Sequence, residues 1–307
     1  MIRTRNLVKF ANFIWIIAFC SSCQHNSTSN GLSQFKNLDS VSDFAPELWI
    51  QENSFKGSFS ADFNSFYFFR KEAPGVENYI PMVSHFKNGV WQKPTPPDFY
   101  DPSYSYTYQL ADPNSDRLFY ISNQRMKADT TQTPNYNFWY MNINKSKYSD
   151  PQELGHRSLM YHYNSQPCIT NTGRIYFNAD LPDWSETLSY VMDVRNQEHS
   201  EPVLFEPVNE WRKNEDWTVF EYCVSPNEDF MIVCIQDRSV TTLSADLYIS
   251  YAKHNSWTRP ELLGHGINSD GTENFPVITH DGKYMIYTRA FSEFKIVPTA
   301  IFLTSGS

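Results

Sequence analysis

The sequence has few basic residues and none of the charge clustering typical of nucleic-acid binding. Lysine and arginine number 25 among 307 residues, against 34 aspartates and glutamates, and the formal net charge is −9. Proteins that hold a phosphate backbone need clustered Lys and Arg side chains. The composition therefore excludes a nucleic-acid partner and is typical of a solvated acidic surface.

Motifs of metal, nucleotide and serine-hydrolase sites are also missing. The eight histidines, which include His156 and His162, form no His-x-His pair with metal-ligand spacing. The sequence has no Gly-x-Ser-x-Gly turn and no glycine loop of the phosphate-binding type. We predict neither a metal nor a cofactor.

Cysteine is scarce outside the N-terminal region. Of five cysteines, three lie beyond it, namely Cys168, Cys223 and Cys234. This odd number leaves at least one thiol unpaired within the chain. We interpret the three as small buried side chains in preference to a disulfide framework.

The N-terminus has the pattern of a targeting segment. Arg3, Arg5 and Lys9 precede an apolar stretch of ten residues from Phe10 to Phe19. That stretch is too short for a helix across a bilayer core of about 30 Å, and its length fits the h-region of a signal peptide.

Small residues precede Cys23, and this arrangement resembles a bacterial lipoprotein signal. The resemblance implies a signal peptide over residues 1–22 and lipidation of Cys23. An ordinary cleaved signal peptide is the alternative, and Cys20 is a second candidate acceptor, although it follows the bulky Phe19. Residues 23–44 are polar without periodicity, which predicts a tether.

Anchoring of this kind places the protein in the bacterial cell envelope, with the lipid as its only contact with the membrane. In a Gram-negative cell, Gln24 stands where an aspartate is associated with inner-membrane retention. Its presence favours the outer membrane over the inner one.

A polar turn followed by a strand of aromatic and aliphatic residues occurs five times. The turns begin at Ser60, Asp112, Thr170, Ser225 and Thr279, at spacings of 52, 58, 55 and 54 residues. Strand hairpins repeated with a period near fifty are typical of radial or stacked repeat folds. The Asp, Asn, Gly and Pro residues of these turns are interpreted as turn-forming and turn-capping groups.

Each copy can be divided into strands a, b, c and d. Strands a and b flank the polar turn, and strand c is apolar, with the fifth copy assigned to 299–306. Strand d contains a proline, which suits an outer edge where a missing N–H removes no ladder hydrogen bond. The last copy has no strand d, whereas residues 46–51 resemble one, so we predict that they pair with 299–306 and close a ring.

This pattern predicts an all-β fold over residues 45–307, a five-bladed β-propeller of four-stranded antiparallel blades closed by an N-terminal strand. An open solenoid is the alternative. The segments SPNEDFMIV from Ser225 and HDGKYMIYTR from His280 resemble WD-repeat-like, TolB-type propeller repeats of bacterial envelope proteins. The resemblance implies a periplasmic or surface propeller and no single activity.

The a–b and c–d turns of such a blade share one face, which we call the first face, and the b–c and d–a loops share the second face. The second face has the irregular loops, so we expect the binding site there. Its candidate ligand-binding residues are Arg70, Arg125, Arg238, Arg289, Trp184 and Trp217. The arginines either clamp an anionic ligand or pair with loop carboxylates such as Asp180 and Asp183, and the aromatic rings either grip a ligand or pack between blades.

Two functions remain open. The favoured one is a non-catalytic module that binds a protein or a glycan at the second face. The alternative is a glycan-active enzyme, a glycosidase or a lyase, with Glu221 and Glu273 as its acid–base pair. Glycoside chemistry would require their carboxyl groups to lie about 5–10 Å apart at an open cleft.

Overall fold

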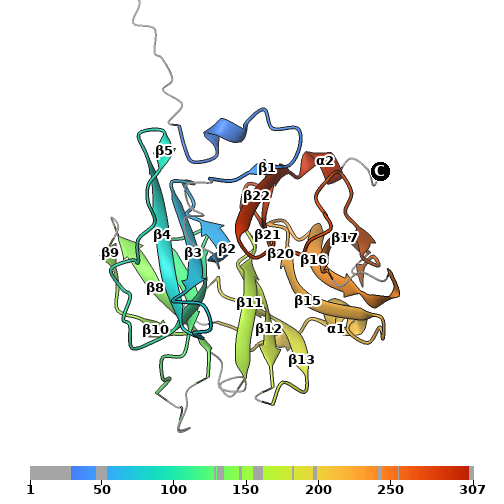
Figure 1. The fold of residues 1–307 in the computed structure, drawn as a ribbon. Coiled ribbons are helices and arrows are strands. Elements are labelled where there is room, and N and C mark those ends of the chain that lie inside the picture. Colours follow the sequence, from blue (N-terminus) through green and yellow to red (C-terminus); the bar gives the residue numbers. More distant parts are fainter. Residues whose placement is uncertain are drawn as a thin grey trace, which may run out of the picture.

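The structure is a computed structural model, in which residues 29–45, 54–127, 129, 135–144, 147–154, 162–181, 183–195, 199–240, 244–254 and 256–303 are described. These residues form five antiparallel sheets arranged as the blades of a propeller (Figure 1). The fold class predicted from the repeats is confirmed.

The first three blades follow the chain in order. The first contains β2 (Ser54–Phe59), β3 (Ser65–Lys71), β4 (Tyr79–Lys87) and β5 (Val90–Trp91). The second contains β6 (Tyr106–Ala111), β7 (Arg117–Ser122), β8 (Asn137–Asn144), β9 (Lys147–Tyr148) and β10 (Gln152–Glu153). The third contains β11 (Tyr163–Ile169), β12 (Arg174–Asp180), β13 (Thr187–Asp193) and β14 (Val203–Leu204).

The last two blades complete the ring, and the fifth includes strands from both ends of the described chain. The fourth contains β15 (Trp217–Val224), β16 (Phe230–Asp237), β17 (Asp246–Lys253), β18 (Ser256–Trp257) and β19 (Glu261–Leu262). The fifth contains β20 (Glu273–Ile278), β21 (Tyr284–Arg289), β22 (Glu293–Pro298) and β1 (Ser42–Asp43). Within the described residues four short helices accompany the sheets, namely η1 (Ser33–Phe35), α1 (Glu206–Trp211), η4 (Arg238–Val240) and α2 (Ala300–Leu303).

The innermost strands make the ring. β2 contacts β6, β6 contacts β11, β11 contacts β15, β15 contacts β20, and β20 returns to β2. Apolar side chains of neighbouring sheets fill the spaces between blades, and burial of this surface provides the main stabilisation of such a fold. The prediction of buried, unpaired thiols is confirmed at Cys168, Cys223 and Cys234.

The polar turns are capped by their own side chains. The Ser60 hydroxyl donates to Asp62 at 2.6 Å, the Thr279 hydroxyl donates to Asp281 at 2.7 Å, and Asp112 accepts from the Asn114 N–H at 2.9 Å. Gly282 has a φ of +72°, a conformation that a glycine adopts without strain. These contacts confirm the turn-capping interpretation.

The closing strand differs from the prediction. β1 pairs with β22 through Ser42–Ile296 and Asp43–Lys295, so an N-terminal strand does complete the last blade (Figure 1). It comes from residues that precede the predicted segment 46–51, which lies outside the described residues. The last strand c is β22, and the predicted strand at 299–306 is wrong because residues 300–303 form α2.

The reason for this difference is a tight turn. Ala290 and Phe291 have φ values of +50° and +57°, and the chain reverses there within three residues to begin β22. The apolar sequence that resembles a strand is instead one helical turn. It buries Phe302, whose ring packs 6.2 Å from that of Phe230.

Residues 29–44, assigned above to the tether, lie against the propeller. Leu32, Phe35 and Phe44 are buried, in one apolar cluster with Phe66 and Trp91. Residues 1–28, including the predicted signal peptide and Cys23, lie outside the described part of the chain. Within that part, no helix is long and apolar enough to cross a membrane.

The inner strands share one irregularity that matters for the site. Four of them contain a residue with positive φ four positions before the polar turn, namely Lys56, Tyr108, Gln166 and Phe275. The strand pairing shifts register at each of these places, as expected for a β-bulge. In β15 the register shifts between Val219 and Glu221, so Glu221 occupies the same repeat position at the edge of the irregularity.

Candidate functional site

A cavity of about 370 Å³ lies at the second face, where β15, β16 and β20 approach one another. We call it the central cavity. It is lined by Gln166, Phe220, Glu221, Cys234, Gln236, Ala245, Thr272, Asn274, Phe275 and Phe291. The lining includes the residues that precede β17 and β20 and the turn after β21, so the cavity lies on the loop face that the sequence predicts.

Glu221 is the ionisable group with the least usual environment in this cavity. Its side chain is 2% exposed, and its Oε1 accepts a hydrogen bond from the Phe275 N–H. Its Oε2 has no hydrogen-bond partner among the described residues. Burial raises the pKa of this carboxyl to about 7, against the opposing effect of the Lys56 charge.

Lys56 occupies the equivalent position in the first blade. It is 1% exposed, and its Nζ lies 5.8 Å from the centre of the Tyr108 ring. Within the described chain this ammonium has no hydrogen-bond acceptor. It lines a small cavity of about 40 Å³ at the first face, together with Cys168, Cys223 and His280.

Three phenylalanines give the central cavity an aromatic lining. Phe220 and Phe291 are 42% and 47% exposed, so both rings are accessible from solvent. Phe275 is half-buried and contacts Phe55 at a ring distance of 5.4 Å. Asn274 adds a buried amide whose Oδ1 accepts no hydrogen bond from the described residues.

The arrangement suits binding better than two-carboxylate catalysis. Glu273 is fully buried, and its Oε1 accepts hydrogen bonds from Arg289 Nε at 2.8 Å and from the Ser269 hydroxyl at 2.5 Å. It does not line the central cavity, whereas its neighbours Thr272 and Asn274 do. The structure therefore does not place Glu221 and Glu273 together at an open cleft. No group of three or more His, Cys, Asp or Glu side chains in the described residues is placed to hold a metal ion.

Three of the four predicted arginines make contacts close to their own blades. Arg289 also donates to the Ile267 carbonyl at 2.9 Å, Arg238 donates to the Thr218 hydroxyl at 2.9 Å and to the Glu215 carbonyl, and Arg125 lies 4.0 Å from Asp129 Oδ1. Arg70, the residue before the last in β3, has a buried Nε with no hydrogen-bond partner among the described residues. None of the four is among the described residues that line the central cavity.

The carboxylates expected opposite these arginines have other partners. Asp183 accepts a hydrogen bond from the Ser185 hydroxyl at 2.7 Å, and Asp180 accepts one from the Thr187 hydroxyl. Both contacts lie within the third blade. The charge-paired rim between blades that the sequence suggested is not formed by Asp180 and Asp183.

The two tryptophans lie apart from the central cavity and from each other. Trp184 is 65% exposed and its ring lies 5.1 Å from that of Tyr163. Trp217 is buried, donates to Asp237 Oδ2 at 2.9 Å, and lines an open groove of about 630 Å³ between the third and fourth blades.

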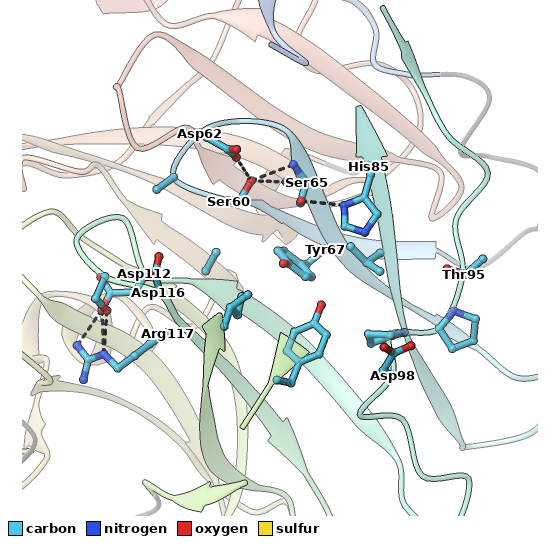
Figure 2. A pocket seen from close by; sticks show the side chains of 18 residues that line it. Ser60, Asp62, Ser65, Tyr67, His85, Thr95, Asp98, Asp112, Asp116 and Arg117 are labelled. Atoms are coloured by element: carbon cyan, nitrogen blue, oxygen red, sulfur yellow. Dashed lines mark hydrogen bonds and ion pairs between the residues drawn. The ribbon is translucent and has the colours of Figure 1, made fainter. Parts of the chain in front are cut away.

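A further cavity of about 460 Å³ lies between the first two blades at the first face (Figure 2). Several of its polar side chains bond to one another. Arg117 pairs with Asp112 at 2.8 Å, and Ser65 Oγ lies 2.9 Å from His85 Nδ1, whose pKa is lowered by burial. These bonds occupy part of the polar lining, which also includes Asp98 and Asp116.

Sequence reasoning identified Glu221 and missed the residues around it. Lys56, Phe220 and Phe291 belong to no motif and look like ordinary strand or turn residues. The signal in the sequence that could have identified Lys56 was its position within the repeat. Four residues before each polar turn the chain carries Lys56, Tyr108, Gln166, Glu221 and Phe275, a set that differs in every copy.

Comparison with protein-family models and with curated proteins finds no match. Among solved structures, prolyl oligopeptidase B from Galerina marginata is similar, with 13% identity, a TM-score of 0.43, and coverage of 76% of this chain and 29% of the peptidase. A microbial sialidase, Hadza Hz136, has 9% identity, a TM-score of 0.42, and coverage of 76% and 53%. A candidate TolB from Agrobacterium tumefaciens has 10% identity, a TM-score of 0.40, and coverage of 84% and 97%. The chain spans about a third of the length of the peptidases, and these similarities concern the propeller fold alone.

Proposed function

We propose that this chain is a non-catalytic binding module of the bacterial envelope that holds a ligand in the central cavity. The observation that carries the proposal is Glu221, a buried carboxylate with one oxygen unpartnered among the described residues in a cavity with an aromatic lining. Burying a charged group without a partner is unfavourable, so such groups concentrate at binding and catalytic sites.

Two further observations favour binding over catalysis. Glu273, the only other carboxylate considered for an acid–base pair, is held by Arg289 and Ser269. The exposed rings of Phe220 and Phe291 resemble the apolar anchors of a recognition surface. The ligand is a protein or a glycan, and attachment to the envelope through Cys23 is part of the proposal.

Photo-crosslinking from the cavity tests this function. Benzoylphenylalanine replaces Phe291 in one variant and Trp184, exposed on another blade, in the matched control. Each protein is irradiated with envelope extract and tested in parallel on a glycan array. We expect one ligand that crosslinks at position 291 and not at position 184. The double variant Phe220→Ser/Phe291→Ser should no longer retain that ligand.

Three outcomes would contradict the proposal. The unsubstituted protein could retain no ligand in either assay. The double variant could bind as well as the parent, which would place the ligand elsewhere. A retained glycan could be converted to product, which would make the protein an enzyme.

A further inference from the structure

The buried polar atoms left without a partner in the central cavity are hydrogen-bond acceptors. Among the described residues, no donor reaches Glu221 Oε2 or Asn274 Oδ1, and both residues line the cavity. The described lining contains no lysine or arginine. Lys56, the nearest buried cation, lines the separate small cavity at the first face.

We propose that the central cavity binds an alkylammonium group, which donates to Glu221 Oε2 and Asn274 Oδ1 while its hydrocarbon stem packs on Phe220, Phe275 and Phe291. This inference rests on the proposed function and specifies its ligand chemistry. A protonated amine supplies three N–H donors and a positive charge, which match one carboxylate oxygen and one amide oxygen. An anionic ligand would be repelled by Glu221, and a neutral one would leave its charge uncompensated.

The aromatic residues favour the same ligand. A cation near the face of an aromatic ring is attracted by the negative charge density of that face, and more strongly in a desolvated site. Phe220 and Phe291 are the exposed members of the three rings, so they are accessible to an incoming chain. A volume of about 370 Å³ accommodates an amine with a short alkyl stem.

The same chemistry has two sources, the side chain of lysine in a partner protein, which agrees with the proposed function, and a free small amine, which would replace the protein or glycan as its ligand. Nα-acetyl-lysine amide represents the first and butylammonium the second. Their uncharged counterparts are Nα,Nε-diacetyl-lysine amide and butanol. Affinity for each is measured by calorimetry on the full chain.

We expect each amine to bind at least tenfold more tightly than its uncharged counterpart. The variant Glu221→Gln keeps the shape and removes the charge, so it should lose that preference. Glu186→Gln, at an exposed carboxylate that lines the groove between the third and fourth blades, is the matched control and should keep it. Phe220→Ala, at an exposed position, should weaken both amines without lowering the melting temperature.

A pH series provides an independent readout. With a pKa of about 7, Glu221 is about one-tenth ionised at pH 6 and nine-tenths at pH 8, so amine affinity should rise about tenfold over that interval. Lys56, Tyr108, Cys223 and Cys234 are the titratable groups coupled to Glu221. A hydrogen bond with Cys168 lowers the pKa of the Cys223 thiol, so the series is repeated in Cys223→Ala.

Binding by butylammonium alone assigns a free amine, and binding by the lysine amide alone assigns a protein side chain. Equal affinity for charged and uncharged probes, or full amine affinity in Glu221→Gln, would overturn the inference. So would the absence of amine binding. In each of those cases the crosslinking experiment at Phe291 still decides the proposed function separately.

Discussion

The hydroxyl group of Tyr284 in β21 donates a 3.0 Å hydrogen bond to the carbonyl oxygen of Phe35, 249 residues earlier in the chain. The contact is buried, and it fastens the segment before β1 onto the blade that β1 completes. The two ends of the described chain therefore belong to one packed unit.

The aromatic cluster around Phe44 should be a main source of stability. The Phe44 side chain is 0% exposed, and its ring lies 5.0 Å from Phe66 and 5.8 Å from Trp91. Phe44→Ala should lower the free energy of unfolding by about 3–5 kcal/mol. Urea denaturation measures the change, and Phe291→Ala, at an exposed position, should alter it by no more than about 0.5 kcal/mol. Equal effects of the two substitutions would contradict closure through this segment.

The pair formed by Glu273 and Arg289 should be structural. Glu273→Ala leaves the Arg289 guanidinium, 23% exposed, without its carboxylate, and breaking such a pair should lower the free energy of unfolding by about 3 kcal/mol. A double-mutant cycle with Arg289→Met tests the coupling. Strictly additive effects would argue against an interaction between the two side chains.

Glu221 should make stability fall with rising pH. Its pKa is about 7 in the folded protein and about 4.3 in an unfolded chain, so the folded state binds the proton more tightly. The stabilising contribution of the protonated Glu221 carboxyl is fully present below about pH 4 and is lost as pH rises through 7. Its loss lowers the free energy of unfolding by about 3 kcal/mol. Unfolding of the parent and of Glu221→Gln at pH 4, 6 and 8 measures it. A stability difference that stays constant over this range would contradict the assignment.

Arg125 and Arg238 should support their loops without contributing to the ligand site. Each contacts groups of its own blade, and exposed ion pairs contribute about 0–1 kcal/mol. Replacing either with Ala should speed proteolysis after β7 or β16 and leave capture at the central cavity unchanged. Loss of ligand binding with unaltered proteolysis would instead favour the interpretation in which these arginines clamp an anionic ligand.

Lipidation of Cys23 remains a prediction from sequence. Cys23→Ala should abolish labelling with a fatty-acid analogue and release the protein from the membrane fraction. The parallel variant Cys20→Ala should keep both. Labelling that depends on Cys20, or on neither residue, would reject the assignment.

The repeats predicted most of the fold because each strand hairpin has a local signal. Three outer strands were also predicted, since β10, β14 and β19 each begin directly after a proline of the kind expected in strand d. Strand c of the last blade was not predicted correctly, because β22 and α2 are both short and apolar and either sequence suits a strand. Their difference depends on a tight turn with two residues of positive φ, Ala290 and Phe291, neither of which is a glycine.

The site was only partly predictable for a different reason. Glu221 stands out as a carboxylate in an apolar strand, whereas the roles of Lys56 and Phe291 depend on how blades meet. For the arginines, the sequence left open whether they clamp an anionic ligand or pair with loop carboxylates. Their partners, such as Glu273 and the Ile267 carbonyl, become visible only when strands and loops are placed together.

The recurring bulge of the inner strands has a consequence for orientation. A fivefold backbone repeat would by itself accept a guest in five rotations about the propeller axis. The equivalent positions carry an ammonium, a phenol, an amide, a carboxylate and a phenyl ring, on Lys56, Tyr108, Gln166, Glu221 and Phe275. These differences remove the rotational symmetry, with a cation in the first blade and a carboxylate in the fourth. The five blades are therefore not interchangeable at this repeat position, and a polar molecule would meet a different group on each.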